Sequence, residues 1–580
     1  MNLLVVVLPV AAILWIAYLT YGRVLSRLLR LDPSRPTPAI QLRDDLDYSP
    51  IEPKFLFPQH FSAIAAAGPI VGPILAGLYF GWLPALIWIV VGSILIGGVH
   101  DMTALVASIR HKARSIAEVV RDHMTPRSYF LFLSFVWLAL VYIIVAFTDI
   151  TAQAFIGEQT LENGEKVSGG GIATSSLLYL ALPIIMGILL RYTKLSLNLA
   201  TVIFVPLVGV AIWLGQTYPF DLTAIFGIED AAAHKVWDVL LLAYCLVAAV
   251  VPVWMLLQPR GHLGGYFLYA ALAAAAVGLF FGRETVQYPA FTTWNSAAGG
   301  ALFPMLFITI ACGACSGFHS LIASGTTSKQ LRKETDARAI GYGAMLLEGL
   351  VATVSLCCVM VLAKDSPLAA SGKPNLIYAQ GIGGMLEPTG ISASFAVSFA
   401  LMAFTTFVYD TLDVCTRLGR YIIQELLGAH NAKGKWIGTI LTAGVPLFFV
   451  MQTAHDANGN VIPVWRMFWA LFGASNQLLA ALTLLGVTVW LWRTRRATWV
   501  WFVTGIPTAL MYVMSTWALV DMIAAKVRTQ GSAWYLDAVT WVAIVLVALA
   551  ALMLVEAARV LWGLRSAPPP PAPRSVTATA

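Results

Sequence analysis

Five ionisable side chains stand within or at the ends of long apolar runs of the sequence. His100 and Asp101 are adjacent in one run, Glu348 stands alone in another, and His60 and His319 lie at the ends of two more. In lipid, such groups face the protein interior or a watery cavity and commonly carry protons. Imidazoles and buried carboxyl groups titrate near neutral pH. We therefore expect proton carriers among these five residues.

Two of these positions also have a structural interpretation that the sequence leaves open. Arg110 follows the His100–Asp101 pair by about two helical turns, which would place the pair at the cytoplasmic end of its span. Glu348 could form a structural ion pair. For Asp410 and Asp413, one turn apart and just before Arg417 and Arg420, we expect ion pairing with those arginines at the membrane interface.

Two Gly-Pro pairs occur in the apolar segment that begins at His60. Proline removes a backbone donor and glycine relaxes the dihedral limits, so an unbroken helix is not expected here. Unwound backbone is tolerated in a bilayer where protein or a cavity covers it, and it can bind an ion or a substrate. The predicted binding residues are Gly68, Pro69, Gly72 and Pro73. A simple proline kink is the alternative.

A second polar segment ends the ninth apolar run. Hydroxyl groups are concentrated where a lipid-facing helix would be aliphatic, so this face should point into the bundle. Its predicted ion- or substrate-binding residues are Ser316, His319, Ser320, Ser324, Thr326 and Thr327. Hydrogen bonding between helices is the alternative interpretation.

Residues 252–259 form a second candidate broken helix, with a proline at each end and with Trp254 and Gln258 as further candidate binding residues. This segment lies five spans after the first break and has the opposite membrane orientation. An inverted repeat of five helices would place two breaks in this way. We therefore predict a five-plus-five inverted-repeat core.

Composition sets the class of protein. Of 580 residues, 59% are hydrophobic and only 11% are charged, which is more apolar surface than a soluble core can bury. We expect an all-α polytopic membrane protein with about 15 transmembrane helices. The net charge of +7 comes from short Lys/Arg clusters between apolar runs. This is the pattern of cytoplasmic loops and excludes a nucleic-acid-binding face.

The alternation of basic and acidic loops predicts an N-terminus outside and a C-terminus in the cytoplasm. We divide the chain into a first helix with a basic loop (1–57), the first part of a transporter core (58–390), C-terminal spans (391–563) and a disordered Pro-rich tail (564–580). Cys312 and Cys315 have the spacing of a metal or redox motif, but no second pair accompanies them. We predict helix packing for them, and no metal site, cofactor or disulfide framework.

Residues 60–76, 252–260 and 315–330 resemble hallmark stretches of the carbon starvation protein A family. The resemblance covers most of residues 1–500 and implies a secondary transporter of the bacterial inner membrane with the five-plus-five fold. The family contains proposed peptide transporters and pyruvate/proton symporters. The resemblance therefore implies import of pyruvate or a similar carboxylate by proton symport during carbon starvation. The coupling ion would be H⁺, with Na⁺ as the alternative.

Other functions remain as alternatives. Short peptides are a second cargo within the same architecture. A nutrient sensor is conceivable if a partner supplies the signalling domain. An intramembrane hydrolase is suggested only by residues 473–476, which loosely resemble a serine-nucleophile turn without an evident histidine partner. Expected partners are the small-molecule substrate and the lipid bilayer, and the oligomeric state is left open.

Overall fold

Twelve helical segments in the described part of the chain are long and apolar enough to cross a membrane, and a bent pair of shorter helices would make a thirteenth. These come from a computed structural model, which describes residues 1–44, 48–161, 165–252, 254–282, 284–429, 431–455 and 461–565. An all-α polytopic membrane fold is therefore confirmed. Apolar side chains such as Val202, Phe280 and Phe502 are exposed on peripheral helices, as expected for surfaces that face lipid.

Residues 4–123 contain the first span, the bent pair and a span interrupted by a π-helical turn. The elements are α1 (Leu4–Leu19), α2 (Tyr21–Leu29), α3 (Pro38–Gln41), α4 (Pro53–Ile64), α5 (Gly68–Phe80), α6 (Trp82–Gly92), η1 (Ser93–Gly97), α7 (Gly98–Arg110) and α8 (Ile116–His123).

The middle of the chain forms five long helices and a small hairpin. Its elements are α9 (Pro126–Ala154), β1 (Glu158–Thr160), β2 (Lys166–Ser168), α10 (Gly169–Tyr192), α11 (Leu197–Thr217), α12 (Leu222–Phe226), α13 (Asp230–Val250) and α14 (Leu257–Phe281). The two strands pair antiparallel, with Glu158 opposite Ser168.

The next elements are short or interrupted until the long helix α20. They are β3 (Asn295–Ser296), β4 (Gly300–Ala301), α15 (Leu302–Thr309), α16 (Phe318–Gly325), η2 (Thr327–Lys329), η3 (Glu334–Asp336), η4 (Arg338–Gly343), α17 (Ala344–Met360), α18 (Pro367–Ser371), α19 (Pro374–Leu386), η5 (Glu387–Thr389) and α20 (Ala393–Leu427).

The C-terminal part adds four long helices. Its elements are α21 (Ala432–Val450), β5 (Ala454–His455), β6 (Val461–Ile462), α22 (Val464–Arg495), η6 (Trp501–Gly505), α23 (Ile506–Gln530), η7 (Gly531–Leu536) and α24 (Ala538–Arg565). Residues 566–580, most of the predicted Pro-rich tail, lie outside the described residues.

The predicted count of about 15 spans is not confirmed. Two of the predicted spans, those starting near residues 301 and 436, are not among the segments that meet the length and polarity requirements. The first is divided into the short helices α15 and α16, and the second corresponds to α21, a 19-residue helix with two lysines in its first turns.

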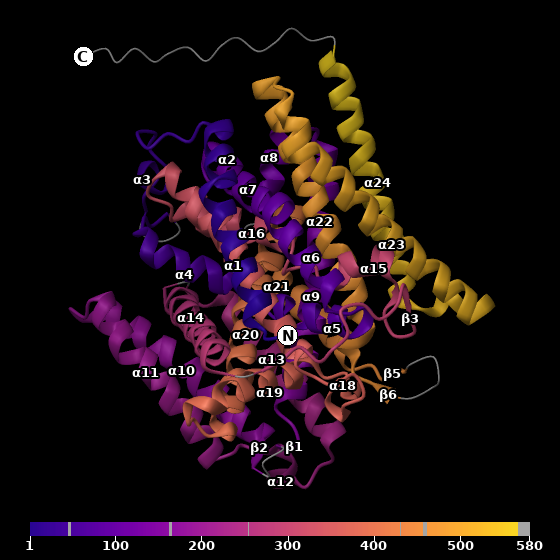
Figure 1. The fold of residues 1–580 in the computed structure, drawn as a ribbon. Helices are drawn as coiled ribbons and strands as arrows, with labels where there is room; N and C mark the ends of the chain where they lie inside the picture. The colour runs from indigo at the N-terminus through magenta and orange to yellow at the C-terminus, as the bar shows by residue number, and fades with distance from the viewer. Residues whose placement is uncertain are drawn as a thin grey trace.

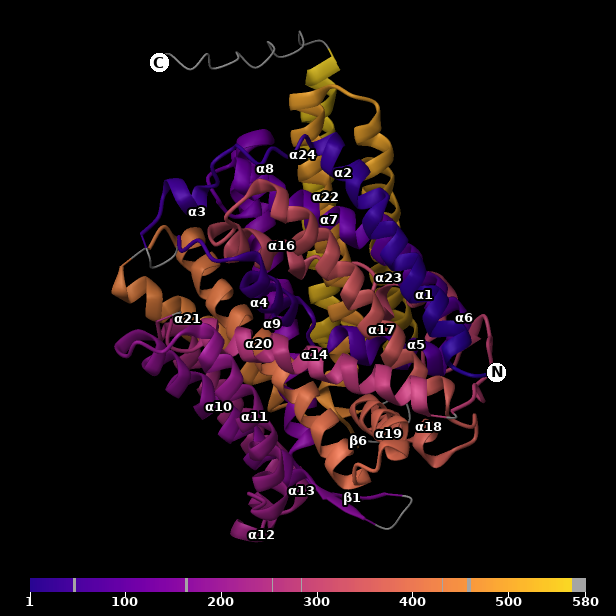
Figure 2. The same ribbon diagram turned by 60° about the vertical axis from the view of Figure 1, so that its left-hand side comes forward.

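Helices α9, α20 and α22 occupy the middle of the bundle, whereas α11 and α24 lie at its periphery (Figures 1 and 2). The basic loops gather at the end of the molecule where α2, α3 and α8 lie. There Arg35 and Arg110 both pair with Glu334, at 3.0 and 2.8 Å, and Arg493 donates to the His123 carbonyl at 2.8 Å. Loops predicted to share one side of the membrane thus meet.

The first predicted break is present, slightly earlier than expected. Helix α4 ends at Ile64, α5 begins at Gly68, and the two are bent by 45°. Pro69 lies in the first turn of α5, where its missing N–H costs no helical bond. The second Gly-Pro pair, Gly72-Pro73, lies inside α5 and does not unwind it.

The second predicted break is wrong. Helices α13 and α14 are two separate long helices, so Pro252 lies in the connection between two spans and Pro259 lies in the first turn of the second. Val253 lies outside the described residues. A different span is interrupted instead, because residues 310–317 separate α15 from α16. The five-plus-five repeat stays a prediction.

Candidate functional site

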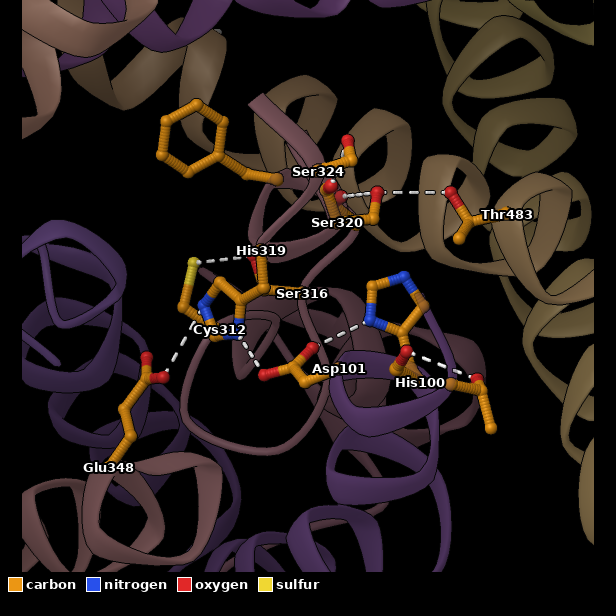
Figure 3. Close-up of polar contacts among 12 residues, drawn as sticks. His100, Asp101, Cys312, Ser316, His319, Ser320, Ser324, Glu348 and Thr483 are labelled. Atoms are coloured by element: carbon orange, nitrogen blue, oxygen red, sulfur yellow. Dashed lines mark hydrogen bonds and ion pairs between the residues drawn. The ribbon is translucent and has the colours of Figure 1, made fainter. Parts of the chain in front are cut away.

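A chain of imidazole and carboxylate groups lies in the centre of the bundle. The His319 Nδ1 is 2.8 Å from one oxygen of Asp101, and the His100 Nδ1 is 2.7 Å from the other. On its opposite side, His319 Nε2 lies 3.3 Å from a Glu348 oxygen. Figure 3 shows the His319 ring between the two carboxylates. All four side chains are fully buried, so they face the interior of the bundle and not lipid.

Three elements bring this chain together, each next to irregular helix. Helix α7 carries His100 and Asp101 and follows the π-helical turn η1, while α17 carries Glu348 and follows the π-helical turn η4. Helix α16 carries His319 in its first turn, directly after the break. Such π-helical turns are frequent at functional sites because they re-aim the side chains that follow.

The two broken spans touch where their helices are interrupted. A Cβ atom at Gly68 would collide with Cys312, and one at Gly72 would collide with the Thr309 carbonyl. Glycine is therefore required for this close approach. Helix α4, which ends at Ile64, packs against α16, the helix that carries His319. The first break thus lies against the buried chain, although Gly72 and Pro73 serve packing.

The predicted hydroxyl face divides into two groups. Ser320 bonds Thr483 of α22 at 3.1 Å, and Ser324 accepts from the N–H of Ile116 in α8 at 3.2 Å. Ser316 bonds the side chain of Asn476, which also accepts from the first N–H of α16. These three serines join helices, which is the alternative that the sequence left open.

The other group lines a cavity beside the first break. The cavity measures about 50 Å³ and is bounded by His60, Thr326, Thr327, Gln330 and Asp410, among others. His60 Nδ1 bonds the Thr327 hydroxyl at 2.8 Å. Thr326 and Thr327, two of the predicted hydroxyl residues, therefore line the same cavity as His60, a predicted proton carrier.

A second buried charge network joins α14 to α20. Arg260 pairs with Asp410 through Nε at 2.9 Å and with Asp413 and Tyr244 through Nη1. Ser62 of α4 donates to the other oxygen of Asp410. Two carboxylates thus share one guanidinium, and one oxygen of Asp413 has no hydrogen-bond partner among the described residues.

This network corrects two predictions. Asp410 and Asp413 do not pair with Arg417 and Arg420 at the interface. Arg417 instead donates to the carbonyls of Ala248 and Val251, at the end of α13. Arg260 belongs to one of the basic clusters between apolar runs, for which the sequence predicts a cytoplasmic loop, but it is 1% exposed because α14 already begins at Leu257 and carries it into the bundle.

The sequence model of the family described as "Carbon starvation protein CstA" matches residues 2–378 and 363–518. The chain belongs to this family. The peptide transporter CstA of Escherichia coli (strain K12) is 32% identical over 88% of this chain and 80% of its own length. The pyruvate/proton symporter BtsT of the same organism is 31% identical over 89% of this chain and 81% of its own length.

A solved structure of a manganese transporter from Eremococcus coleocola aligns with 90% of the CstA-family chain and 99% of its own, at 14% identity and a TM-score of 0.42. The resemblance drawn from the sequence is confirmed by the family match. The protein is therefore a transporter of the CstA family and not an enzyme.

The remaining predicted site residues of the CstA-family chain lie elsewhere. Trp254 packs against Tyr192 and beneath the Arg191 guanidinium, 4.9 Å from the ring centre. Gln258 is half-buried in the first turn of α14 and does not line the small cavity. Ser475, the nucleophile of the hydrolase alternative, donates to the Phe472 carbonyl of its own helix at 3.0 Å.

Arg260 and Asn476 are the site residues that sequence reasoning missed in this CstA-family protein. A weak signal existed for Arg260, because one arginine between two apolar runs can snorkel or be buried. Its two carboxylate partners are 150 and 153 residues away in sequence, so no local pattern could name them. Asn476 was considered only as part of a serine motif.

Proposed function

We propose that the protein is a secondary active transporter that imports a small carboxylate such as pyruvate by proton symport, as part of a response to carbon starvation. The observation that carries this proposal is the fully buried chain of His100, Asp101, His319 and Glu348 beside two broken spans. Alternating imidazole and carboxylate groups pass protons between neighbours. No cofactor is needed beyond the coupling ion.

Glu348 is the proposed site of proton binding. Both of its oxygens are buried without a hydrogen-bond partner among the described residues, and the nearest His319 nitrogen is 3.3 Å away. A buried carboxylate in this state is costly, and a proton lowers that cost. Proton uptake or release at Glu348 would change the charge that His319 and Asp101 experience, and His60 of the neighbouring α4 would respond to it.

The proposed substrate site is the cavity beside the first break. Its volume of about 50 Å³ is a few times the ~10–15 Å³ that one water molecule needs, so a molecule with a handful of heavy atoms fits. The Thr326 and Thr327 hydroxyls and the His60 imidazole can donate to a carboxylate. The hydroxyls would also suit Na⁺, the alternative coupling ion.

A peptide is the second candidate substrate, favoured by a larger cavity. This cavity of about 340 Å³ shares Leu257, Thr326 and Val414 with the small one. Both signs of charge line it, with Arg114, Lys329, Arg417, Glu118 and Glu425. A zwitterionic peptide needs a partner for each terminus, and this space offers both.

The proposed location is a bacterial inner membrane. The basic end that carries α2, α3 and α8 would be cytoplasmic, because cytoplasmic loops retain Lys and Arg. The N-terminus would then lie outside and the C-terminus in the cytoplasm. Both relatives named above come from a bacterium.

The test is uptake of labelled pyruvate and, separately, a labelled dipeptide into proteoliposomes, with and without an inward proton gradient. We expect pyruvate accumulation that a protonophore abolishes. In Glu348→Gln, gradient-driven accumulation should be lost while exchange of labelled for unlabelled pyruvate continues, because exchange needs no net proton movement. Glu387→Gln, which removes an exposed carboxyl in η5, is the control and should transport normally.

Accumulation of the dipeptide alone would assign the peptide function instead. Uptake of neither compound would contradict the proposal and favour a sensor. Unaltered proton-driven accumulation in Glu348→Gln would refute the role of this carboxyl while leaving the transport function intact.

A further inference from the structure

Three potential metal ligands converge far from the central network. Asp149 lies in the last turns of α9, and His234 and Asp238 lie in the first turns of α13. One ligand atom from each comes within 4.8 Å of the other two. His234 Nε2 is 3.2 Å from the Oδ1 of Asp149 and 3.1 Å from the backbone carbonyl oxygen of the same residue. These residues are separated by up to 89 positions in sequence, so their spacing gave no sign of a metal site.

Asp238 supplies an independent indication of a missing cation. Its side chain is fully buried, and neither oxygen has a hydrogen-bond partner among the residues that the structure describes. Lys235 Nζ is 3.9 Å away, but this ammonium donates to the carbonyls of Val450 and Gln452. A buried carboxylate left in this state is costly unless a proton or a cation joins it.

We propose that Asp149, His234 and Asp238 bind one divalent transition-metal ion of the Zn²⁺ class. One imidazole nitrogen and two carboxylate oxygens are ligands that such ions accept, with a fourth position left for water. Tetrahedral ligands at about 2.0–2.1 Å from the ion lie about 3.3 Å apart. The His234–Asp149 distance already meets this, and the other side chains need to close by about 1.5 Å at most.

The surroundings suit a bound ion. The second oxygen of Asp149 accepts from the Trp465 N–H at 2.8 Å, which fixes the orientation of this carboxylate as outer partners do in metal sites. The His234 side chain is 14% exposed and offers a route from solvent. The helix ends concerned lie towards the β1–β2 hairpin and α12, remote from the basic end (Figures 1 and 2). The ion would therefore join α9 to α13 there, and to α22 through Asp149.

The test is metal binding by the purified full chain, with its tag removed and metals stripped by a chelator. Zn²⁺ is titrated by calorimetry, and Co²⁺ is added separately so that its visible absorption reports the ligand set. Asp238→Asn and His234→Gln are compared with wild type. Glu158→Gln, an exposed carboxylate in β1 that pairs with Lys166 at the same end, is the matched control.

We expect one equivalent of Zn²⁺ per chain in wild type and control, with affinity reduced at least about 10-fold in both site variants. Zn²⁺ should also raise the melting temperature of wild type and not that of the variants. The proposal would be overturned if wild type does not bind Zn²⁺ stoichiometrically, or if Zn²⁺ binding is unchanged in His234→Gln. His234→Gln keeps both carboxylates, so it decides the question even if Asp238→Asn does not fold.

Discussion

Replacing Arg260 with methionine should be the most destabilising of the changes considered in the second charge network. The guanidinium is 1% exposed and lies between Asp410 and Asp413, which are 6% and 1% exposed. Arg260→Met leaves two buried carboxylates side by side with no cation between them. Removing one partner of a buried ion pair costs about 3–5 kcal/mol. Asp413→Asn should cost less than about 2 kcal/mol, because one carboxylate and one guanidinium remain balanced.

The assay is unfolding of the detergent-solubilised protein by SDS titration, followed by tryptophan fluorescence. Arg559→Met is the control, because this arginine is 66% exposed and pairs with Glu556 at 3.0 Å, an interaction worth at most about 1 kcal/mol. The double variant Arg260→Met/Asp413→Asn should recover part of the loss. If Arg260→Met costs no more than Arg559→Met, or no more than Asp413→Asn, the charge-balance reasoning is refuted.

Further expectations concern packing, the second break and the basic end. Gly68→Ala should cost about 1–3 kcal/mol because its methyl group meets the second broken span, whereas Gly209→Ala meets open space and should stay within about 1 kcal/mol in the same titration. Asn476→Ala should cost about 1–3 kcal/mol by leaving the first N–H of α16 unpaired. Ser475→Ala should cost under about 1 kcal/mol, because its hydroxyl bonds only within its own helix. Equal losses of stability in Asn476→Ala and Ser475→Ala would contradict the conclusion that Asn476 stabilises the start of α16. Burial and a neighbouring imidazole lower the pKa of His123, outside the spans, to about 4, so folding favours its neutral form. The stability present above about pH 6.5 should therefore fall as the pH drops towards 4. Melting curves recorded across that range should show a smaller fall in His123→Gln than in wild type. Parallel pH profiles of the two proteins would contradict this role of His123.

The features that could be predicted from the sequence are those where local chemistry forces the outcome. A Gly-Pro step in an apolar run predicts an interrupted helix, and the span does break beside Gly68, although α5 continues through Gly72-Pro73. Buried ionisable groups need partners, and His100, Asp101, His319 and Glu348 indeed meet. Their burial could be inferred, but their order could not, because it depends on how three separate helices pack.

The features that could not be predicted depend on contacts between distant segments. Asp410 and Asp413 have arginines in their own next turn, so local pairing was the natural expectation, yet Arg260 reaches them from another helix. The prolines of residues 252–259 also led to a wrong prediction of a broken helix, because a proline near the end of a span and a proline that breaks a span look alike in sequence. Only the separate lengths of α13 and α14 distinguish the two cases.

Helix α4 is the element that both charge networks share. His60 bonds Thr327, Ser62 bonds Asp410, and α4 packs against α16, the helix that carries His319. A displacement of α4 about its bend would alter all three contacts at once. A proton gained or lost in either network would, by the same contacts, change the preferred position of α4. Under the proposed function, the broken span would link proton occupancy to the opening of the cavity beside it, which an unbroken helix packed rigidly along its length would not.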